Sequence, residues 1–445
     1  MFTGKTKERA SYIVKISGTC NLGCPYCYYF KNKSRTANST MSFDLLEKFL
    51  REAPKQSRQI EVIWHGGEPL TAGIDIFKKA KALQRQIEQE FGVRFRNLLQ
   101  TNATLVSQEW ADFFVAENFG IGVSLDGTEE LHNQHRLSLS HQSTFNKTLR
   151  GIDILKKNNV PISVLCVVTK KSLNYAQKIY KFFTSGLSLD RFDFLPMVEL
   201  PAFAAKTSNE QTTRNFIPGS LEQGDFYRFM KDIFDVWWHD NDPNISVRFL
   251  DNVLIGLLGK QPTSCTFNGS CGEYTTLDTD GTLLPCDNFI EYKNLSFGNM
   301  YSENLGDLLG SSKRLDYIRQ VSQVHTTCSS CKFLEACGGG CRKYNFFLNH
   351  NFSDENYFCG DRWQIFNYVE KQLIQDYQGN RESLKLVLQE NLNQNKPGAN
   401  ILKRLSTPIS YSEMHNSLGR NTWNQGDGWD RWSEWDRNFP PDLHS

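Results

Sequence analysis

Short runs of alternating or continuous apolar residues recur as far as residue 195, and segments with helical spacing separate them. The first run, Ser11–Ser17, alternates apolar and polar residues, which predicts a strand. The segment 44–53 has apolar residues at helical spacing, and Ser42 is placed to cap it. The same pattern predicts strands at 59–64, 94–100, 120–125, 161–169 and 191–195, and helices at 74–91, from 107, at 145–157 and at 172–185.

Six strand–helix units in succession predict an α/β fold in which a parallel sheet curves into a partial (β/α)6 barrel. In such folds the chemistry lies where the strands end and the following loops begin. A cysteine-rich loop, residues 20–27, follows the first strand, and Gly66-Gly67-Glu68-Pro69 follow the second. We therefore expect both segments on the same rim of the barrel.

The overall charge and hydropathy exclude some partners. Lys and Arg number 50 and Asp and Glu 49, so the net charge of +1 gives no reason to expect a nucleic acid or an anionic membrane. No apolar run approaches the roughly 20 residues of a membrane span, and the first residues lack the apolar segment of a signal peptide. We expect a cytoplasmic protein, in which 12 cysteines indicate metal or redox chemistry rather than disulfides.

Three cysteines in the first loop have the spacing of an iron–sulfur site. Cys20, Cys24 and Cys27 can bind three corners of a cubane cluster, which leaves one iron without a protein ligand. An open iron is what a catalytic rather than an electron-carrying cluster needs. A zinc site is the alternative, but zinc requires four closed ligands, and the nearest His after this loop is His65. The spacing favours the cluster.

The same loop, with Asn21 before its second cysteine and Tyr26 before its third, resembles the radical S-adenosylmethionine (SAM) superfamily. The resemblance implies that SAM binds the open iron and that its reductive cleavage yields a 5′-deoxyadenosyl radical, which abstracts hydrogen from carbon. The run from Gly66 to Pro69 resembles the superfamily's motif for the SAM amine, and glycine lets the backbone approach a ligand closely. The implied SAM contacts are Tyr26, Gly66, Gly67, Glu68, Pro69, Ser124 and Arg136.

Two of these contacts also have ordinary explanations. By the resemblance, Ser124 and Arg136 hold the ribose and the carboxylate of SAM, and the planar fork of an arginine suits a carboxylate. Taken alone, Ser124 could instead be a capping serine and Arg136 an exposed surface arginine.

A second cysteine-rich region begins at residue 265, and its eight thiols suffice for two four-cysteine sites. Cys166 lies inside an apolar strand, where we expect it to pack as a small hydrophobe. Two zinc sites are an alternative, because Cys328-x2-Cys331 and Cys337-x3-Cys341 have zinc-like spacings.

The hairpin-like segment 274–287, with its Asp280-Gly281 turn, and the glycine-rich run 337–342 resemble the SPASM extension of radical SAM peptide-modifying enzymes. The resemblance implies two auxiliary clusters and therefore three [4Fe–4S] clusters in all. In that family the first auxiliary cluster uses thiols that match Cys265, Cys271, Cys286 and Cys341, and the second uses thiols that match Cys328, Cys331, Cys337 and Cys359.

Within this group, the stretches 99–105, 165–169 and 284–287 resemble anaerobic sulfatase-maturing enzymes, which oxidise a Cys or Ser of a sulfatase to formylglycine. By that resemblance Asp287 is the base. Once hydrogen leaves the β-carbon, the substrate must still lose a proton and an electron, which a carboxylate and a neighbouring cluster can accept. The alternative for Asp287 is a turn or cap residue.

The residue before Gly66 departs from the maturase pattern, in which a Gln is typical. Here it is His65, and Trp-His-Gly-Gly-Glu-Pro-Leu resembles radical SAM enzymes that form cyclophane crosslinks in ribosomal peptides. His65 follows a strand beside the expected site, so it could contact the substrate or shuttle a proton. A packed, hydrogen-bonded histidine is the alternative.

The chain changes character after Tyr377. We expect a last helix at 381–393, a linker at 394–400 and a Trp-rich tail, in which Trp429, Trp432 and Trp435 step by three. Trp-x-Arg and Trp-x-Asn resemble the units that cyclophane synthases crosslink, so our hypothesis is a fused precursor-like segment from about Leu402. An aromatic lid or interface segment is the alternative.

These observations predict a barrel domain at 1–240, a SPASM domain at 241–377, a helix and linker at 378–400 and the tail at 401–445. The expected function is β-hydrogen abstraction from a peptide or protein followed by a two-electron oxidation. Cyclophane crosslinking of a ribosomal precursor peptide is the first hypothesis, and formylglycine formation in a sulfatase is the second. An iron–sulfur electron carrier is the non-enzymatic alternative. A reductant such as flavodoxin or ferredoxin is expected.

Overall fold

The computed structural model describes residues 7–30, 39–200, 216–377 and 396–406. Its centre is one curved sheet with the strand order β10-β9-β8-β1-β2-β3-β4-β5-β6-β7. Six of these strands follow one another in the chain and pair in parallel: β1 (Lys7–Ser17), β2 (Ser57–Gly66), β3 (Arg94–Thr101), β4 (Phe119–Ser124), β5 (Ile162–Val168) and β6 (Arg191–Pro196). The expected partial barrel is therefore confirmed.

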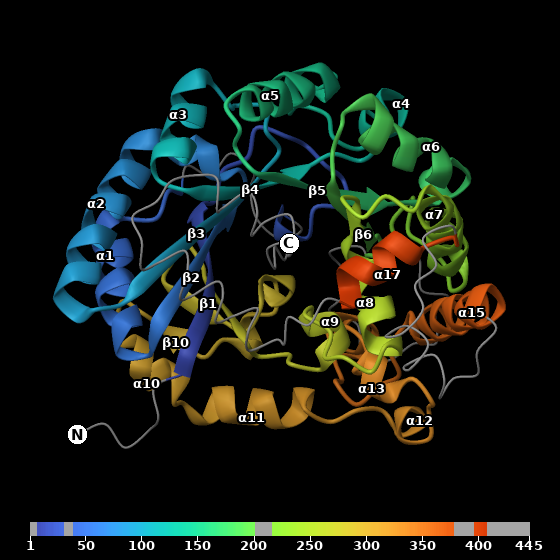
Figure 1. Ribbon diagram of the computed structural model, residues 1–445. Helices are drawn as coiled ribbons and strands as arrows, with labels where there is room; N and C mark the ends of the chain where they lie inside the picture. The colour runs from blue at the N-terminus through green and yellow to red at the C-terminus, as the bar shows by residue number, and fades with distance from the viewer. Residues whose placement is uncertain (1–6, 31–38, 201–215, 378–395, 407–445) are drawn as a thin grey trace.

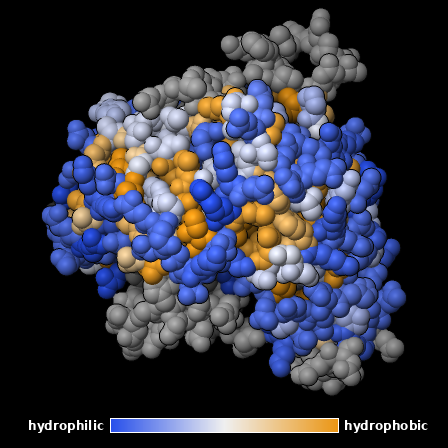
Figure 2. All heavy atoms as spheres, turned by 90° about the horizontal axis from the view of Figure 1, so that it is seen from above, coloured by the Kyte–Doolittle hydropathy of each residue, from blue (hydrophilic) through white to orange (hydrophobic). Residues whose placement is uncertain are grey.

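The helices between these strands form an outer arc around the sheet (Figure 1). They are α1 (Phe43–Glu52), α2 (Ile74–Phe91), α3 (Gln108–Ala116), the short α4 (Glu129–His132), α5 (Phe145–Lys157) and α6 (Ala176–Lys181), followed by α7 (Asp225–Asp240). Ser42 caps α1 as predicted, since its side chain accepts a hydrogen bond from the backbone N–H of Leu45. Figure 2 views the side that carries α3, α4 and α5, where hydrophobic atoms cross a mostly hydrophilic face.

The helix predicted at 172–185 is not one regular element. A 3-10 segment (Lys170–Tyr175) leads into α6, which widens into a π-helical turn at Phe182–Gly186. The side chains of Thr169 and Ser172 cap the start of this segment reciprocally. In the π turn, Phe183 is fully buried while Phe182 stacks on Phe145 of α5, so two consecutive aromatic rings both pack.

The second half of the chain extends the same sheet at both edges. β7 (Ser246–Val247) pairs with β6, and β8 (Tyr274–Leu277) pairs in parallel with β1. The predicted hairpin turn at Asp280-Gly281 joins β8 to β9 (Thr282–Leu284), beside which β10 (Gly298–Asn299) lies antiparallel. The SPASM hairpin is thus an extension of the barrel sheet.

Short helices complete this half and pack below and beside the barrel (Figure 1). They are α8 (Arg248–Leu257), α9 (Cys265–Asn268), α10 (Leu305–Leu309), α11 (Ser312–Val321), α12 (Thr326–Ser329), α13 (Leu334–Cys337) and α14 (Lys343–Asn349). The longer α15 (Cys359–Tyr377) packs on α7. The carboxylate of Asp361 in α15 accepts hydrogen bonds from the backbone N–H groups of Gly224 and Tyr227 at the start of α7.

The last described helix, α17 (Ala399–Ser406), spans the predicted boundary between linker and tail at residue 400. Its Ile401 and Leu402 are fully buried, and Arg404 pairs with Asp251 of α8. The helix predicted at 381–393 and the Trp-rich segment lie outside the described residues. Among the helices described, none has the length and hydropathy required to cross a membrane.

Candidate active site

The loop after β1 carries Cys20, Cys24 and Cys27 into a cavity of about 250 Å³ at the rim of the barrel. Cys20 and Cys24 are buried, and Cys27 is partly exposed. Burial raises the pKa of the Cys20 thiol above its usual value, and Glu68 and then the two neighbouring thiols raise it further. Neutral thiols of this kind become thiolates when they bind a metal, so the set suits a positively charged group.

The eight later cysteines fall into two electrostatic groups. In the first, burial, Asp287 and then the thiols of Cys265 and Cys271 raise the pKa of Cys286. Burial raises the pKa of Cys271 to about 12, the Tyr317 hydroxyl lowers it, and Cys341 adds to it. These four thiols are the predicted ligands of the first auxiliary cluster.

In the second group, the pKa of Cys359 is raised to about 12. Burial is the largest cause, Glu355 is the next, and the thiols of Cys328, Cys337 and Cys331 raise the pKa further. These are the predicted ligands of the second auxiliary cluster. In the described part of the chain no three His, Cys, Asp or Glu side chains gather at a point that would fit a single metal ion. The assignment of the thiols to three cluster-binding sets therefore stays a prediction from the sequence, in which each set would hold a cluster of several irons rather than a single metal ion.

The turn after β2 lies against the cysteine loop. The backbone N–H of Gly67 donates to the carbonyl oxygen of Ser17 at 2.7 Å, and the N–H of Glu68 donates to that of Thr19 at 2.8 Å. Gly66 has φ +141°, which favours glycine, and a Cβ on Gly67 would collide with the Thr19 carbonyl. Gly66, Gly67 and Glu68 line the cavity, whereas Pro69 is buried in the following turn.

The Glu68 side chain is occupied within the protein. Its carboxylate accepts hydrogen bonds from the Thr101 hydroxyl at 2.7 Å and from the backbone N–H groups of Asn102 and Leu70. Burial raises its pKa to about 7, although these bonds favour the charged form. Glu68 therefore joins the ends of β2 and β3, while its backbone faces the cavity.

The predicted contacts at the end of β4 also lie in the cavity wall, with partners that the sequence did not reveal. Ser124 accepts a hydrogen bond from Gln100 at 2.9 Å, and Arg136 pairs with Asp126 at 2.9 Å. The hydroxyl of Tyr26 donates to the same Asp126 carboxylate. Arg136 is neither exposed nor unpaired, and Asp126 neutralises it beside the site.

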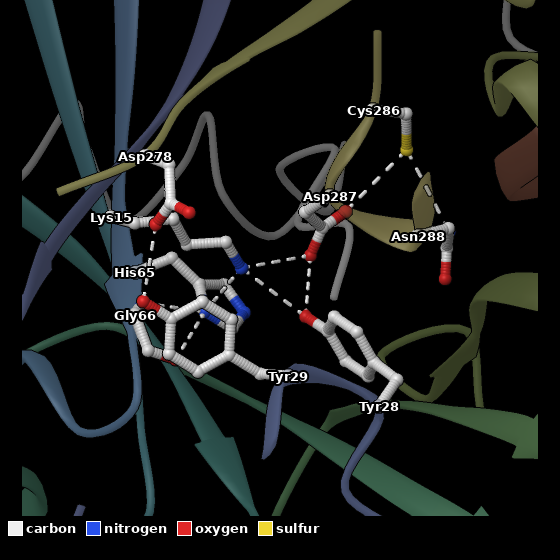
Figure 3. A network of polar contacts seen from close by, with 9 residues as sticks. All are labelled: Lys15, Tyr28, Tyr29, His65, Gly66, Asp278, Cys286, Asp287 and Asn288. Carbon is white, nitrogen blue, oxygen red and sulfur yellow. Dashed lines mark hydrogen bonds and ion pairs between the residues drawn. The ribbon is translucent and has the colours of Figure 1, made fainter. Parts of the chain in front are cut away.

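Asp287 belongs to a buried network that joins the barrel to the SPASM hairpin (Figure 3). Its carboxylate accepts from the Tyr28 hydroxyl at 2.6 Å and from Lys15 Nζ at 3.3 Å. Burial alone would raise the pKa of Asp287, but Lys15, His65 and Tyr28 outweigh it and hold the pKa below its usual value. Tyr28, His65 and the neighbouring Asn288 line the cavity, whereas Asp287 itself is fully buried behind them.

Sequence reasoning missed Lys15, Tyr28, Asp126 and Gln100. Lys15 occupies a polar position of the first predicted strand, and such a position in a sheet with one solvated face is exposed. In a barrel the second face of a strand points inward, and Lys15 shares that face with Ile13, which is buried against Ile63 and Leu98. A lysine between buried isoleucines of a barrel strand is the signal that could have identified it.

The rest of the cavity wall is rich in aromatic rings. They come from the cysteine loop, from β6 and from helices of the second half of the chain: Tyr26, Tyr28, Tyr29, Phe194, Phe226, Phe249, Phe267, Tyr344 and Phe358. Two ion pairs, Asp193 with Arg248 and Glu199 with Lys343, lie among them. Such a wall suits an apolar or aromatic group with a few polar anchors.

Comparison with known proteins agrees with this geometry. Residues 14–183 match the Radical SAM superfamily, and residues 265–332 match an iron–sulfur cluster-binding domain, SPASM. A cysteine-type anaerobic sulfatase-maturating enzyme of Clostridium perfringens is 31% identical over 373 residues, which cover 82% of this chain and 97% of the relative. A serine-type enzyme of Bacteroides thetaiotaomicron is 31% identical over 412 residues, which cover 88% and 93%.

The fold comparison leads to the same group. The structure of native anSMEcpe with bound AdoMet and Cp18Cys peptide superposes with a TM-score of 0.72 at 30% identity, covering 83% of this chain and 99% of that one. The match thus includes the barrel, the SPASM region and the cavity between them. This chain belongs to the radical SAM enzymes with a SPASM domain, in the family of the anaerobic sulfatase-maturating enzymes.

Proposed function

We propose that this protein removes a hydrogen atom from a side-chain β-carbon of a peptide substrate and completes a two-electron oxidation that closes a cyclophane crosslink. The observation that carries this proposal is the cavity, whose wall combines many aromatic rings with Cys20, Cys24 and Cys27. An aromatic wall favours an aromatic substrate residue. The Trp-Asp-Arg unit, which occurs twice in the chain's own tail at Trp429–Arg431 and Trp435–Arg437, supplies residues of that kind.

The cofactors follow from the family and from the arrangement of thiols. The first loop would hold the [4Fe–4S] cluster whose open iron takes SAM, and the two later sets would hold the auxiliary clusters, three in all. When bound, these groups supply the radical that removes the hydrogen atom and a route for the second electron. Gly67, Ser124 and Arg136 line the place where SAM would lie.

The proton that leaves the substrate has a defined destination in this proposal. Asp287 is an ionised carboxylate one residue from Cys286, and the Tyr28 hydroxyl connects it to the cavity. A proton released in the cavity can reach Asp287 through that hydroxyl, because the hydroxyl both donates and accepts. Because Asp287 is adjacent in the chain to Cys286, a predicted cluster ligand, the proton and the electron would leave the substrate toward the same side of the cavity.

Formylglycine formation in a sulfatase is the second candidate. Two relatives that are named for sulfatase maturation match this chain over more than nine-tenths of their own length. It starts with the same β-hydrogen abstraction and uses the same base. The reducing partner that we propose is a flavodoxin or a ferredoxin in the cytoplasm. Neither a nucleic acid nor a membrane enters this proposal.

The test is a product analysis on the anaerobically reconstituted full-length chain with SAM and a reductant. Two synthetic peptides are offered separately, one with the sequence 421–439 and one with a sulfatase-type Cys motif. Loss of two hydrogens from the first peptide or from the tail itself, with fragmentation blocked between a Trp and the residue two positions on, supports crosslinking. Conversion of only the Cys peptide to an aldehyde would replace crosslinking by formylglycine formation.

Two variants separate the steps of this reaction. Cys20→Ala is expected to abolish deoxyadenosine release, because the cluster would lose one of its three protein ligands. Asp287→Asn is expected to keep deoxyadenosine release and to lose about a hundredfold or more in peptide oxidation, which is the low end for removal of a general base. Release of deoxyadenosine by Cys20→Ala would contradict the proposal.

A further inference from the structure

His65 has one buried ring nitrogen that forms no hydrogen bond with any group of the described structure. The side chain is 8% exposed, and its Nε2 is buried without a hydrogen-bond partner. The ring lines the cavity together with Tyr28 and Tyr29, next to the loop of the three cysteines. A buried polar atom of this kind usually costs stability unless a ligand satisfies it.

The other ring nitrogen, Nδ1, is surrounded by donors. The backbone N–H of Gly66 donates to it at 2.9 Å, and the Lys15 ammonium lies 3.2 Å away. Among the described residues, the one acceptor near Nδ1 is the Gly66 carbonyl oxygen, at 3.4 Å. A hydrogen on Nδ1 would point at these two donors, so Nδ1 must act as the acceptor.

The orientation of Lys15 is fixed by its other contacts. Its Nζ has three hydrogens, and it lies 3.2 Å from His65 Nδ1, 3.3 Å from Asp287 and 3.3 Å from the Tyr28 hydroxyl. Each hydrogen therefore has its own acceptor. Lys15 and His65 are also paired neighbours in the register of β1 and β2, so the sheet itself holds them together.

The ring is also kept neutral. Burial lowers the pKa of His65 to about 3, and the Lys15 charge lowers it further against the opposing effect of Asp287. These are the charged groups that the structure places against the ring. A neutral imidazole whose Nδ1 accepts has its single hydrogen on Nε2.

We propose that Lys15 and the Gly66 amide hold His65 as a neutral imidazole with its hydrogen on Nε2, and that this N–H donates a hydrogen bond to an oxygen of the bound peptide substrate. The peptide as acceptor rests on the proposed function. His65 is then a substrate-binding donor, and it is not a proton shuttle, because its lone pair faces Lys15 rather than the cavity. A backbone carbonyl of the peptide is the neutral acceptor that such a donor suits.

The first experiment compares a replacement that keeps a hydrogen-bond donor with one that removes it. His65→Gln can place an amide N–H near the position of Nε2, whereas His65→Phe fills the space without a donor. Binding of the 421–439 peptide to the SAM-loaded, unreduced full-length enzyme is measured by calorimetry. We expect Phe to weaken binding about tenfold or more and Gln to stay within about threefold, since a buried acceptor left unpaired costs more than an altered bond.

Each other outcome has a meaning. Equal losses for Gln and Phe would contradict the donor role and favour a base. A change in SAM affinity without a change in peptide affinity would make SAM, and not the peptide, the source of the oxygen. His239→Phe, on the exposed side of α7, is the control and should bind both ligands as the wild type does.

A second measurement does not depend on any substrate. Neutron diffraction from deuterium-exchanged crystals of the full-length protein is expected to show deuterium on His65 Nε2 and none on Nδ1. Deuterium on Nδ1 would overturn the inference. If the neutron result agrees but neither the 421–439 peptide nor the Cys peptide binds, the proposed function fails and the peptide as acceptor is withdrawn with it.

Discussion

Charged side chains around the site are buried in pairs. Lys15 and Asp287 are both fully buried and lie 3.3 Å apart, and Arg136 in the cavity wall pairs with the buried Asp126. A buried charge without a partner is costly, so each of these charges is stabilised by its partner inside the barrel. The pair of Lys15 and Asp287 also connects a barrel strand to the SPASM hairpin, and it therefore orients the proposed base.

We predict that Lys15→Met destabilises the protein by about 3–5 kcal/mol, because it leaves the Asp287 carboxylate buried without its cation. Denaturant unfolding of variants with equal iron content measures the difference. Lys78→Met is the matched control, since its pair with Glu109 is exposed on both sides; there we expect no measurable change. If both substitutions changed the free energy of unfolding equally, the buried pair would contribute no more to stability than the exposed pair.

At the scale of elements, the site is built from strand ends. The cysteine loop follows β1, the Gly66–Pro69 turn begins at the last residue of β2, Asn102 follows β3 and Ser124 ends β4. Four consecutive parallel strands therefore place residues from their carboxyl ends on one rim. This placement follows from the fold, because parallel strands end on the same side. The close approach of the first two loops depends on glycine at position 67.

Gly67→Ala is predicted to weaken SAM binding at least about tenfold, because even a methyl group that clashes with a packed backbone costs about 1–3 kcal/mol. The new Cβ would collide with the Thr19 carbonyl and push the turn away from the cysteine loop. Equilibrium dialysis with labelled SAM measures the loss. Gly360→Ala in α15 has no neighbour within 4 Å of its added Cβ, so it should bind SAM normally.

At the scale of the whole molecule, the SPASM half is part of the barrel's own architecture. β8 continues the sheet beyond β1, Asp361 of α15 caps α7, and α17 packs on α8 with its Ile401 and Leu402 fully buried. The boundary at residue 240 that the sequence suggested therefore separates two segments that share one sheet. The wall of the cavity comes from both of them.

Leu402→Ala is expected to destabilise the whole protein by about 2–5 kcal/mol, the range for a fully buried leucine. The reason is that Ile401 and Leu402 of α17 belong to the main hydrophobic core, although both lie in the segment predicted as the tail. Thermal unfolding measures the effect. Leu315→Ala on α11 is the matched control, because Leu315 is 54% exposed and its loss should change stability by less than about 0.5 kcal/mol.

The sequence by itself determined the elements and the residue types of the site. Strict strand–helix alternation allows few topologies, so the barrel and its rim could be derived from periodicity alone. The spacing of the cysteines and the resemblance together predict three sets of thiols. Gly66, Gly67, Ser124 and Arg136 line the cavity, as the order of strands and loops along the chain predicts. Local patterns carry this information because turns, caps and ligand spacings are local.

Only the tertiary structure decided which charges meet. The pairing of Lys15 with Asp287 joins residues 272 positions apart, and that of Arg136 with Asp126 depends on how a short helix folds back. No local pattern encodes the contact between Lys15 and Asp287, because it arises only when the SPASM hairpin joins the edge of β1. The same closure leaves His65 with one nitrogen facing Lys15 and the other facing the cavity.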